Sequence, residues 1–360
     1  MRYIVIGAGA IGGAIGGRLH DAGHEVVLVA RGAHAKALRE HGLRLELPDG
    51  DRVLPVPVAE GPDGVTARPD DVLVLAVKTQ DTAAALDAWA GHGDHPAVVC
   101  AQNAVENERL ALRRFRDVYG MCVWLPATYL EPGVVRAPCA PLTGILHLGR
   151  VPAGSDATVR RIAADLEASG FAAPVSDQVM AWKYAKLLSN LGNAVEAVCG
   201  PATDSGTRGE LAARARAEGV AVLDAAGIDH VSAEEQARVR GDRVEVRPVK
   251  GETRGGGSSW QSLVRGTGSI ESDYFNGEIV LLGRRTGVPT PVNERLQRAA
   301  NLFARERRRP GDLSEPELAA LLGTGPRGRR RLPATSPGAS GSRRPRATGP
   351  RRGPVHGPTR

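Results

Sequence analysis

The sequence has few features of a disulfide-stabilised, membrane or metal-binding protein. Its four cysteines are scattered, without the C-x-x-C spacing of zinc and redox sites, and no pair of histidines comes with a supporting acid. We therefore expect free thiols and no metal. No apolar run approaches the roughly 18 residues that a membrane-spanning helix needs. The first apolar run has only four residues, which is too short for a secretory signal. These absences predict a soluble, cytoplasmic protein.

Residues 324–360 lack acidic side chains and contain ten arginines among many Pro, Gly and Ser residues. When these ten charges are removed from the net charge of +7, residues 1–323 carry −3. The basic character therefore belongs to the C-terminal segment, and we expect no nucleic-acid binding by the folded body. Because such a segment has too little apolar surface to fold, we expect it to be disordered.

The chain opens with a dinucleotide-binding pattern. An apolar strand predicted at residues 3–6 precedes a G-x-G-x-x-G motif made by Gly7, Ala8, Gly9, Ala10, Ile11 and Gly12. Gly7 allows the tight turn, Gly9 lets the backbone approach a pyrophosphate, and Gly12 lets the following helix pack closely. The alternative is a glycine-rich turn of another α/β fold. We favour a dinucleotide site, with the pyrophosphate at the N-terminus of the helix.

The second predicted strand, residues 25–30, lacks the acid that usually holds the ribose of NAD at this point. The sequence there is Ala30-Arg31. Because a guanidinium suits a 2′-phosphate, Arg31 favours NADPH over NADH. The alternative is that Arg31 is a solvated loop charge.

Alternating strands and helices continue to residue 177. We expect strands at 71–77, 97–101, 118–126 and 144–148, helices at 82–90 and 156–169, and a hairpin around 48–50. Polar residues follow two of these strands, namely Lys78 and Gln80 after the first and Gln102-Asn103 after the second. This pattern predicts a doubly wound, Rossmann-type NADP-binding domain over residues 1–177, with its ligand at the strand ends.

Helical periodicity dominates from residue 178. We expect helices at 179–199, 210–226, 270–282 and 292–307, and one that begins at the capping box Ser232-x-x-Glu235. Residues 178–309 should form an all-α domain for substrate binding and dimerisation, with residues 310–360 as a tail. In the first of these helices, Lys186, Asn190 and Asn193 fall on one face. This face is either part of a site or the wet side of an ordinary amphipathic helix.

Several of these motifs together resemble the ketopantoate reductase (2-dehydropantoate 2-reductase) family, over roughly residues 1–305. The resemblance rests on Gly7–Gly12, Lys78-Thr79-Gln80, Gln102-Asn103, Trp182…Lys186-Leu187…Asn190 and Ser258-Ser259…Glu271-x-Asp273…Asn276-Gly277. It implies the NADPH-dependent reduction of a 2-keto acid, foremost ketopantoate to (R)-pantoate in pantothenate biosynthesis. It also makes a homodimer plausible.

The resemblance also implies roles for individual residues. Lys186 matches the general acid and Glu271 the glutamate that orients this lysine and the substrate. Asn190 and Ser259 match substrate-binding residues, and the face that Lys186 and Asn190 share brings in Asn193. Asn103 matches the asparagine between nicotinamide and substrate, and Lys78 a lysine near the cofactor.

The sequence departs from the family at Val195-Glu196, where Leu-Thr is usual. This departure leaves the keto acid open, so another keto acid, a hydroxy acid or an opine is an alternative substrate. An alternative of another class is a non-catalytic NADPH-binding regulator.

Overall fold

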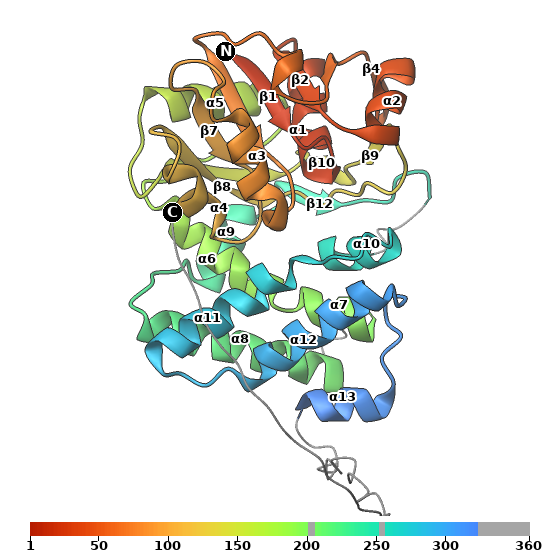
Figure 1. Ribbon diagram of the computed structural model, residues 1–360, viewed down its shortest axis with the longest axis vertical. Helices are drawn as coiled ribbons and strands as arrows, with labels where there is room; N and C mark the ends of the chain where they lie inside the picture. The colour runs from red at the N-terminus through yellow and green to blue at the C-terminus, as the bar shows by residue number, and fades with distance from the viewer. Residues whose placement is uncertain (201–205, 252–255, 323–360) are drawn as a thin grey trace, which may run out of the picture. The chain divides into compact units, whose positions relative to one another are not determined.

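A computed structural model describes residues 1–200, 206–251 and 256–322 of the chain (Figure 1). Its first part is an α/β domain around a seven-stranded sheet of order β11-β8-β7-β6-β1-β2-β5. These strands are β1 (Arg2–Ile6), β2 (Glu25–Val29), β5 (Val58–Ala59), β6 (Asp71–Leu75), β7 (Ala97–Cys100), β8 (Val118–Trp124) and β11 (Ile145–Arg150). Every pair is parallel except β8–β11. The sheet confirms the expected Rossmann-type architecture.

Both faces of this sheet are covered, as continuous apolar strands require. In β1, Tyr3 and Val5 pack into one core, whereas Ile4 and Ile6 pack into another on the opposite face. The helices of this domain are α1 (Ala10–Asp21), α2 (Gly32–His41), α3 (Thr82–Trp89), α4 (Asn107–Leu112) and α5 (Ala157–Ala168), with short 3-10 turns η1 (Pro62–Gly64) and η2 (Thr79–Asp81).

The expected hairpin is present as the antiparallel pair β3 (Leu43–Leu47) and β4 (Gly50–Leu54), and β9 (Val134–Arg136) extends it into a three-stranded sheet. A further pair joins β10 (Cys139–Pro141) to β12 (Val244–Val246). Because β12 lies within residues 178–309, the helical second domain also contains one short strand. The strand ties the helical part back to the first domain.

The second part of the chain is otherwise helical. Its helices are α6 (Val179–Asn190), α7 (Asn193–Cys199), α8 (Thr207–Ala225), α9 (Ala233–Arg240), α10 (Ser258–Val264), α11 (Asn276–Thr286), α12 (Pro291–Glu306) and α13 (Glu315–Leu322), with the 3-10 turn η3 (Glu271–Tyr274). Helices α8, α11 and α12 lie side by side (Figure 1). The capping box is confirmed, because Glu235 N donates to Ser232 Oγ at 3.1 Å. In the part of the chain that the structure describes, no helix is long and apolar enough to span a bilayer.

The expected single helix over residues 179–199 is instead the two helices α6 and α7, separated at Leu191-Gly192. The buried Asn276 side chain explains the break, since its Nδ2 donates to the Leu191 carbonyl at 3.2 Å. A continuous helix would use that carbonyl for the N–H four residues on. Glycine at position 192 further weakens the helix.

Two other expectations about the helical part need correction. Residues 270–282 form η3 followed by α11 rather than one helix, because Phe275, with φ −107° and ψ −85°, leaves the helical conformation. Helix α13 lies within the segment assigned to the tail, and its Leu318 and Leu321 are buried in the helical core. The packed body thus extends to residue 322. The expectation of disorder in residues 323–360 lies outside the described residues.

Candidate active site

A cavity of about 470 Å³ opens between the strand ends of the sheet and the first helices of the helical part. Its lining includes residues from both, among them Gly7, Gly9, Ala10, Ile11, Lys78, Asn103, Lys186, Asn190, Asn193, Ser258 and Glu271. Many of the residues that the sequence predicted as a site thus border one space, although they span more than 260 positions.

The glycine motif forms one wall of this cavity. Gly7 has a φ of +103°, which glycine tolerates, and a Cβ on Gly12 would lie 2.1 Å from the Gly7 carbonyl oxygen. Gly12 therefore packs the helix against the loop, as predicted, and does not face the cavity. Ala8 is also turned away, since its N–H donates to Val29 O at 3.1 Å. A Cβ on Gly9 would meet nothing within 4 Å, so the backbone there is open to a ligand.

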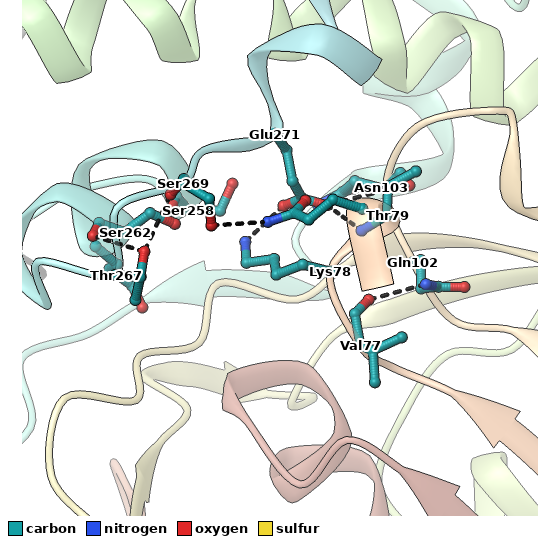
Figure 2. A network of polar contacts seen from close by, with 12 residues as sticks. Val77, Lys78, Thr79, Gln102, Asn103, Ser258, Ser262, Thr267, Ser269 and Glu271 are labelled. Atoms are coloured by element: carbon teal, nitrogen blue, oxygen red, sulfur yellow. Dashed lines mark hydrogen bonds and ion pairs between the residues drawn. The ribbon is translucent and has the colours of Figure 1, made fainter. Parts of the chain in front are cut away.

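The ends of β6 and β7 continue this wall. Gln102 Nε2 donates to Val77 O at 2.8 Å, which ties the two strand ends together (Figure 2). It also donates to Thr82 Oγ1 at 2.7 Å. Next to it, Asn103 lines the cavity, and its Oδ1 is buried with no hydrogen-bond partner in the described part of the chain. An unsatisfied buried amide oxygen is costly, so this acceptor is suited to a ligand donor.

The helical wall carries the expected polar face. Lys186, Asn190 and Asn193 all line the cavity despite the break between α6 and α7. The Lys186 ammonium lies 5.0 Å from the centroid of the Trp124 ring. Asn190 Nδ2 is buried and lacks a hydrogen-bond partner within the described ranges. These polar side chains therefore border a cavity, which favours the interpretation of this face as part of a site.

The side chain of Glu271, on η3 of the helical part, contacts the loop that follows β6 of the sheet. Its Oε2 accepts from Lys78 Nζ at 2.5 Å, and its Oε1 accepts from the N–H and Oγ1 of Thr79 at 3.1 and 3.0 Å (Figure 2). Both carboxylate oxygens are thus engaged by the loop after β6. The expectation that Glu271 orients Lys186 stays a prediction: the described contacts pair the carboxylate with Lys78, and Glu271 and Lys186 line the same cavity. Together with burial, this carboxylate raises the pKa of the nearby Asp81.

Besides Ala8 and Gly12, three further predicted residues do not line the cavity. Ser259 is buried, whereas its neighbour Ser258 faces the space. Arg31 is exposed beyond β2, and its Nε donates to Glu60 O at 3.5 Å. Gln80 donates from Nε2 to Ser269 Oγ at 3.4 Å, at the contact between the two parts of the chain.

A buried ion pair lies directly behind the cavity. Lys183, one turn before Lys186, pairs with Glu108, and their side chains are 2% and 0% exposed. Lys183 Nζ also donates to Gln102 O at 2.9 Å. The pair therefore connects α6 and α4 to the strand end that carries Asn103. Despite Lys183, burial raises the pKa of Glu108.

The motifs missed several lining residues, namely Asp81, Tyr129, Glu196, Gln261 and Arg265. Glu196 stands one turn after Asn193, so extending the polar face by three residues would have found it. Its Oε2 accepts from Gly257 N at 2.9 Å. Nothing in the local sequence singles out Gln261 or Arg265. Among the described residues, no three His, Cys, Asp or Glu side chains come together as a metal site requires.

Comparison with known proteins agrees with this arrangement. Residues 3–151 match the family described as Ketopantoate reductase PanE/ApbA, and residues 178–304 match Ketopantoate reductase PanE/ApbA C terminal. The 2-dehydropantoate 2-reductase of Halobacterium salinarum is 30% identical over 317 residues, which cover 85% of this chain and all of that protein.

Solved structures share the fold. The crystal structure of a PanE/ApbA family ketopantoate reductase from Ralstonia eutropha JMP134 has a TM-score of 0.70 at 28% identity, covering 85% of this chain and 99% of that one. D-mandelate dehydrogenase with NADH and anilino(oxo)acetate has a TM-score of 0.72 at 23% identity, with the same coverage, and shows the fold alone. The chain therefore belongs to the ketopantoate reductase family of NADP-dependent oxidoreductases.

Proposed function

We propose that this chain reduces 2-dehydropantoate (ketopantoate) to (R)-pantoate with NADPH, and that Lys186 donates the proton. One observation carries the proposal: the glycine motif and Lys186 border the same cavity. Reduction of a ketone needs a reductant and a proton donor at one carbonyl group. A cavity with a dinucleotide loop on one wall and an ammonium group on the other meets that need.

The residues of the sheet wall fit the dinucleotide. Helix α1 begins at the cavity with no acid in its first turn, and no side chain of the described residues caps its N-terminus. Such a helix end, with its unpaired N–H groups, suits a pyrophosphate. The exposed Arg31 stands where an acid would favour NAD, and its guanidinium suits a 2′-phosphate. When bound, NADPH supplies the hydride.

The residues of the helical wall fit the keto acid. Lys186 protonates the keto oxygen, and its charge stabilises the negative charge that develops there. Asn190 Nδ2 is a buried donor without a partner in the described part of the chain, so it is suited to a substrate oxygen. Glu271 holds Lys78 and Thr79 in place at the edge of the cavity.

A second candidate function is the same chemistry on another acid. D-mandelate dehydrogenase has this fold, so the fold does not select ketopantoate. The carboxylate of Glu196 disfavours an aromatic keto acid but does not choose among aliphatic ones. It faces the cavity, and a charged group beside a bound phenyl ring would be desolvated without compensation.

A panel of keto acids tests the proposal. The purified full chain is mixed with NADPH and ketopantoate, 2-ketoisovalerate, pyruvate or benzoylformate, and the loss of reduced nicotinamide is followed. We expect ketopantoate to give the highest kcat/KM and NADPH to be preferred over NADH. Turnover of another acid but not of ketopantoate would favour the second candidate. NADPH binding with no turnover of any acid would favour a regulator. A homodimer and a cytoplasmic location stay predictions from the sequence.

A further inference from the structure

Arg265 is a cation of the cavity that no motif identified. It directly follows α10, lines the cavity and is half-buried. Its guanidinium carbon stands 5.5 Å from the centroid of the Tyr129 ring, which also borders the space. An ordinary structural role would be to stabilise the C-terminus of α10, where carbonyl groups attract a cation. The Nε atom does this, donating to Gln261 O at 3.3 Å.

This helix-end contact uses only Nε, so it does not explain the position of the other two guanidinium nitrogens. Within the described ranges, the guanidinium makes one hydrogen bond, to Gln261 O, and forms no ion pair with a carboxylate. The acidic side chain with the strongest electrostatic effect on it, Glu271, already has both oxygens engaged by Lys78 and Thr79. Burial lowers the pKa of Arg265, which is the mark of a cation whose desolvation is not offset by a partner.

A guanidinium with two uncommitted nitrogens in a cavity is built to bind an oxyanion. Its planar fork can donate two parallel N–H bonds to a carboxylate or a phosphate. Under the proposed function the cavity holds two oxyanion ligands. The phosphates of the dinucleotide would lie near the N-terminus of α1, and the substrate carboxylate would lie near Lys186. We propose that Arg265 is a ligand-binding residue that holds an oxyanion of the bound substrate or of the dinucleotide. This inference rests on the proposed function for the identity of the two ligands.

Replacement of Arg265 by Met tests the inference, because Met retains the apolar stem and removes the charge. Loss of a charge-assisted pair should weaken binding of the ligand by about 10- to 100-fold. The Kd of NADPH is measured by direct titration of the full chain without substrate, and the KM of ketopantoate by steady-state kinetics at saturating NADPH. A rise in KM with unchanged Kd identifies the substrate carboxylate. A rise in Kd identifies a phosphate of the dinucleotide.

Arg265→Lys and Arg298→Met are the matched controls. Lysine keeps the charge but not the fork, so it should restore part of the lost affinity. Arg298 is an exposed α12 residue paired with Glu294 at 3.5 Å, and its replacement removes one charge from the same helical part away from this cavity. It should change neither constant.

Unchanged Kd and KM in Arg265→Met, with or without a lower Tm, would overturn the inference and leave Arg265 as a helix-end residue. The outcome for the proposed function is separate, because it depends on whether the unmodified chain turns over ketopantoate. If it turns over another keto acid, the KM of that acid replaces that of ketopantoate, and the titration with NADPH needs no turnover.

Discussion

The two walls of the cavity are built in different ways. The centre of the sheet wall is backbone and small residues of one continuous motif, with Gly7, Gly9 and the start of α1, and the ends of β6 and β7 lie beside it. The helical wall is made of charged and amide side chains from several segments, such as Lys186, Glu196 and Arg265. The difference teaches that binding of a common cofactor needs shape and open backbone, whereas binding and protonation of a particular acid need side chains brought together by the fold.

Replacement of Lys186 by Met should show the largest difference between the two walls, because it should affect catalysis and leave NADPH binding intact. Loss of a proton donor should lower kcat about 10²- to 10⁴-fold, whereas the sheet wall should still bind NADPH with little change in Kd. Steady-state kinetics and direct titration measure the two effects. Lys36→Met, which removes an exposed lysine of α2, should leave kcat unchanged. Equal losses of kcat and NADPH affinity would show that the two walls do not have separate functions in cofactor binding and proton transfer.

The ion pair behind the cavity offers a second comparison. Lys183→Met should cost about 3–5 kcal/mol in the free energy of unfolding, because it leaves Glu108 buried without its partner. It should also lower kcat, since Gln102 O loses the donor that holds the strand end against α6. The free energy of unfolding is measured by urea denaturation.

Arg2→Met is the matched control for that variant. It breaks another buried pair, Arg2 with Asp71 at 2.7 Å, at the opposite ends of β1 and β6 from the cavity. A comparable loss of stability without a change in kcat is expected. If both variants lowered kcat equally, the role of Lys183 would be stability alone.

His147 on β11 stacks on Trp182 of α6, with ring centroids 3.7 Å apart. Both of its ring nitrogens are buried without a partner in the described part of the chain, and burial lowers its pKa to about 4. The unfolded chain therefore binds a proton below about pH 6.5, which the folded chain takes up only near pH 4. Stability should fall by about 2 kcal/mol between pH 7 and pH 5 from this group.

Replacement by Phe, which can still stack on Trp182, should remove that part of the pH dependence. Urea denaturation of both proteins at pH 5 and pH 7 measures it. An unchanged difference between the two pH values would mean that His147 is protonated in the folded chain.

Two glycine substitutions with the smallest expected effects distinguish packing from ligand binding in the sheet wall. Gly12→Ala should destabilise the fold by about 1–3 kcal/mol, because its Cβ would lie 2.1 Å from Gly7 O and 2.9 Å from Ala76 Cβ. Gly9→Ala should leave stability nearly unchanged and raise the Kd of NADPH, since its Cβ fills space meant for the ligand. Urea denaturation and titration distinguish the two. Loss of stability in Gly9→Ala with an unchanged Kd would contradict the assignment.

The same contrast explains what could be predicted from the sequence. The glycine motif, the buried strands and the capping box at Ser232 depend on neighbouring residues, and they appear where expected. The polar face of Lys186 and Asn190 follows from helical spacing, and both residues line the cavity. These features need only local geometry.

Features set by distant contacts could not be predicted. The partner of Glu271 lies 193 positions away at Lys78, and the break at Leu191 depends on an amide 85 positions away at Asn276. The resemblance pointed to Ser259, yet Ser258 faces the cavity. No local pattern contains this information, because each depends on how the two parts of the chain pack together.

A crystal structure of the full chain with NADPH and ketopantoate tests the central claim most directly. The measured quantity is the distance from Lys186 Nζ to the keto oxygen. We predict a hydrogen bond of about 3 Å, with Glu271 still paired to Lys78. A keto oxygen bound by another donor, with Lys186 out of hydrogen-bonding reach, would contradict the account.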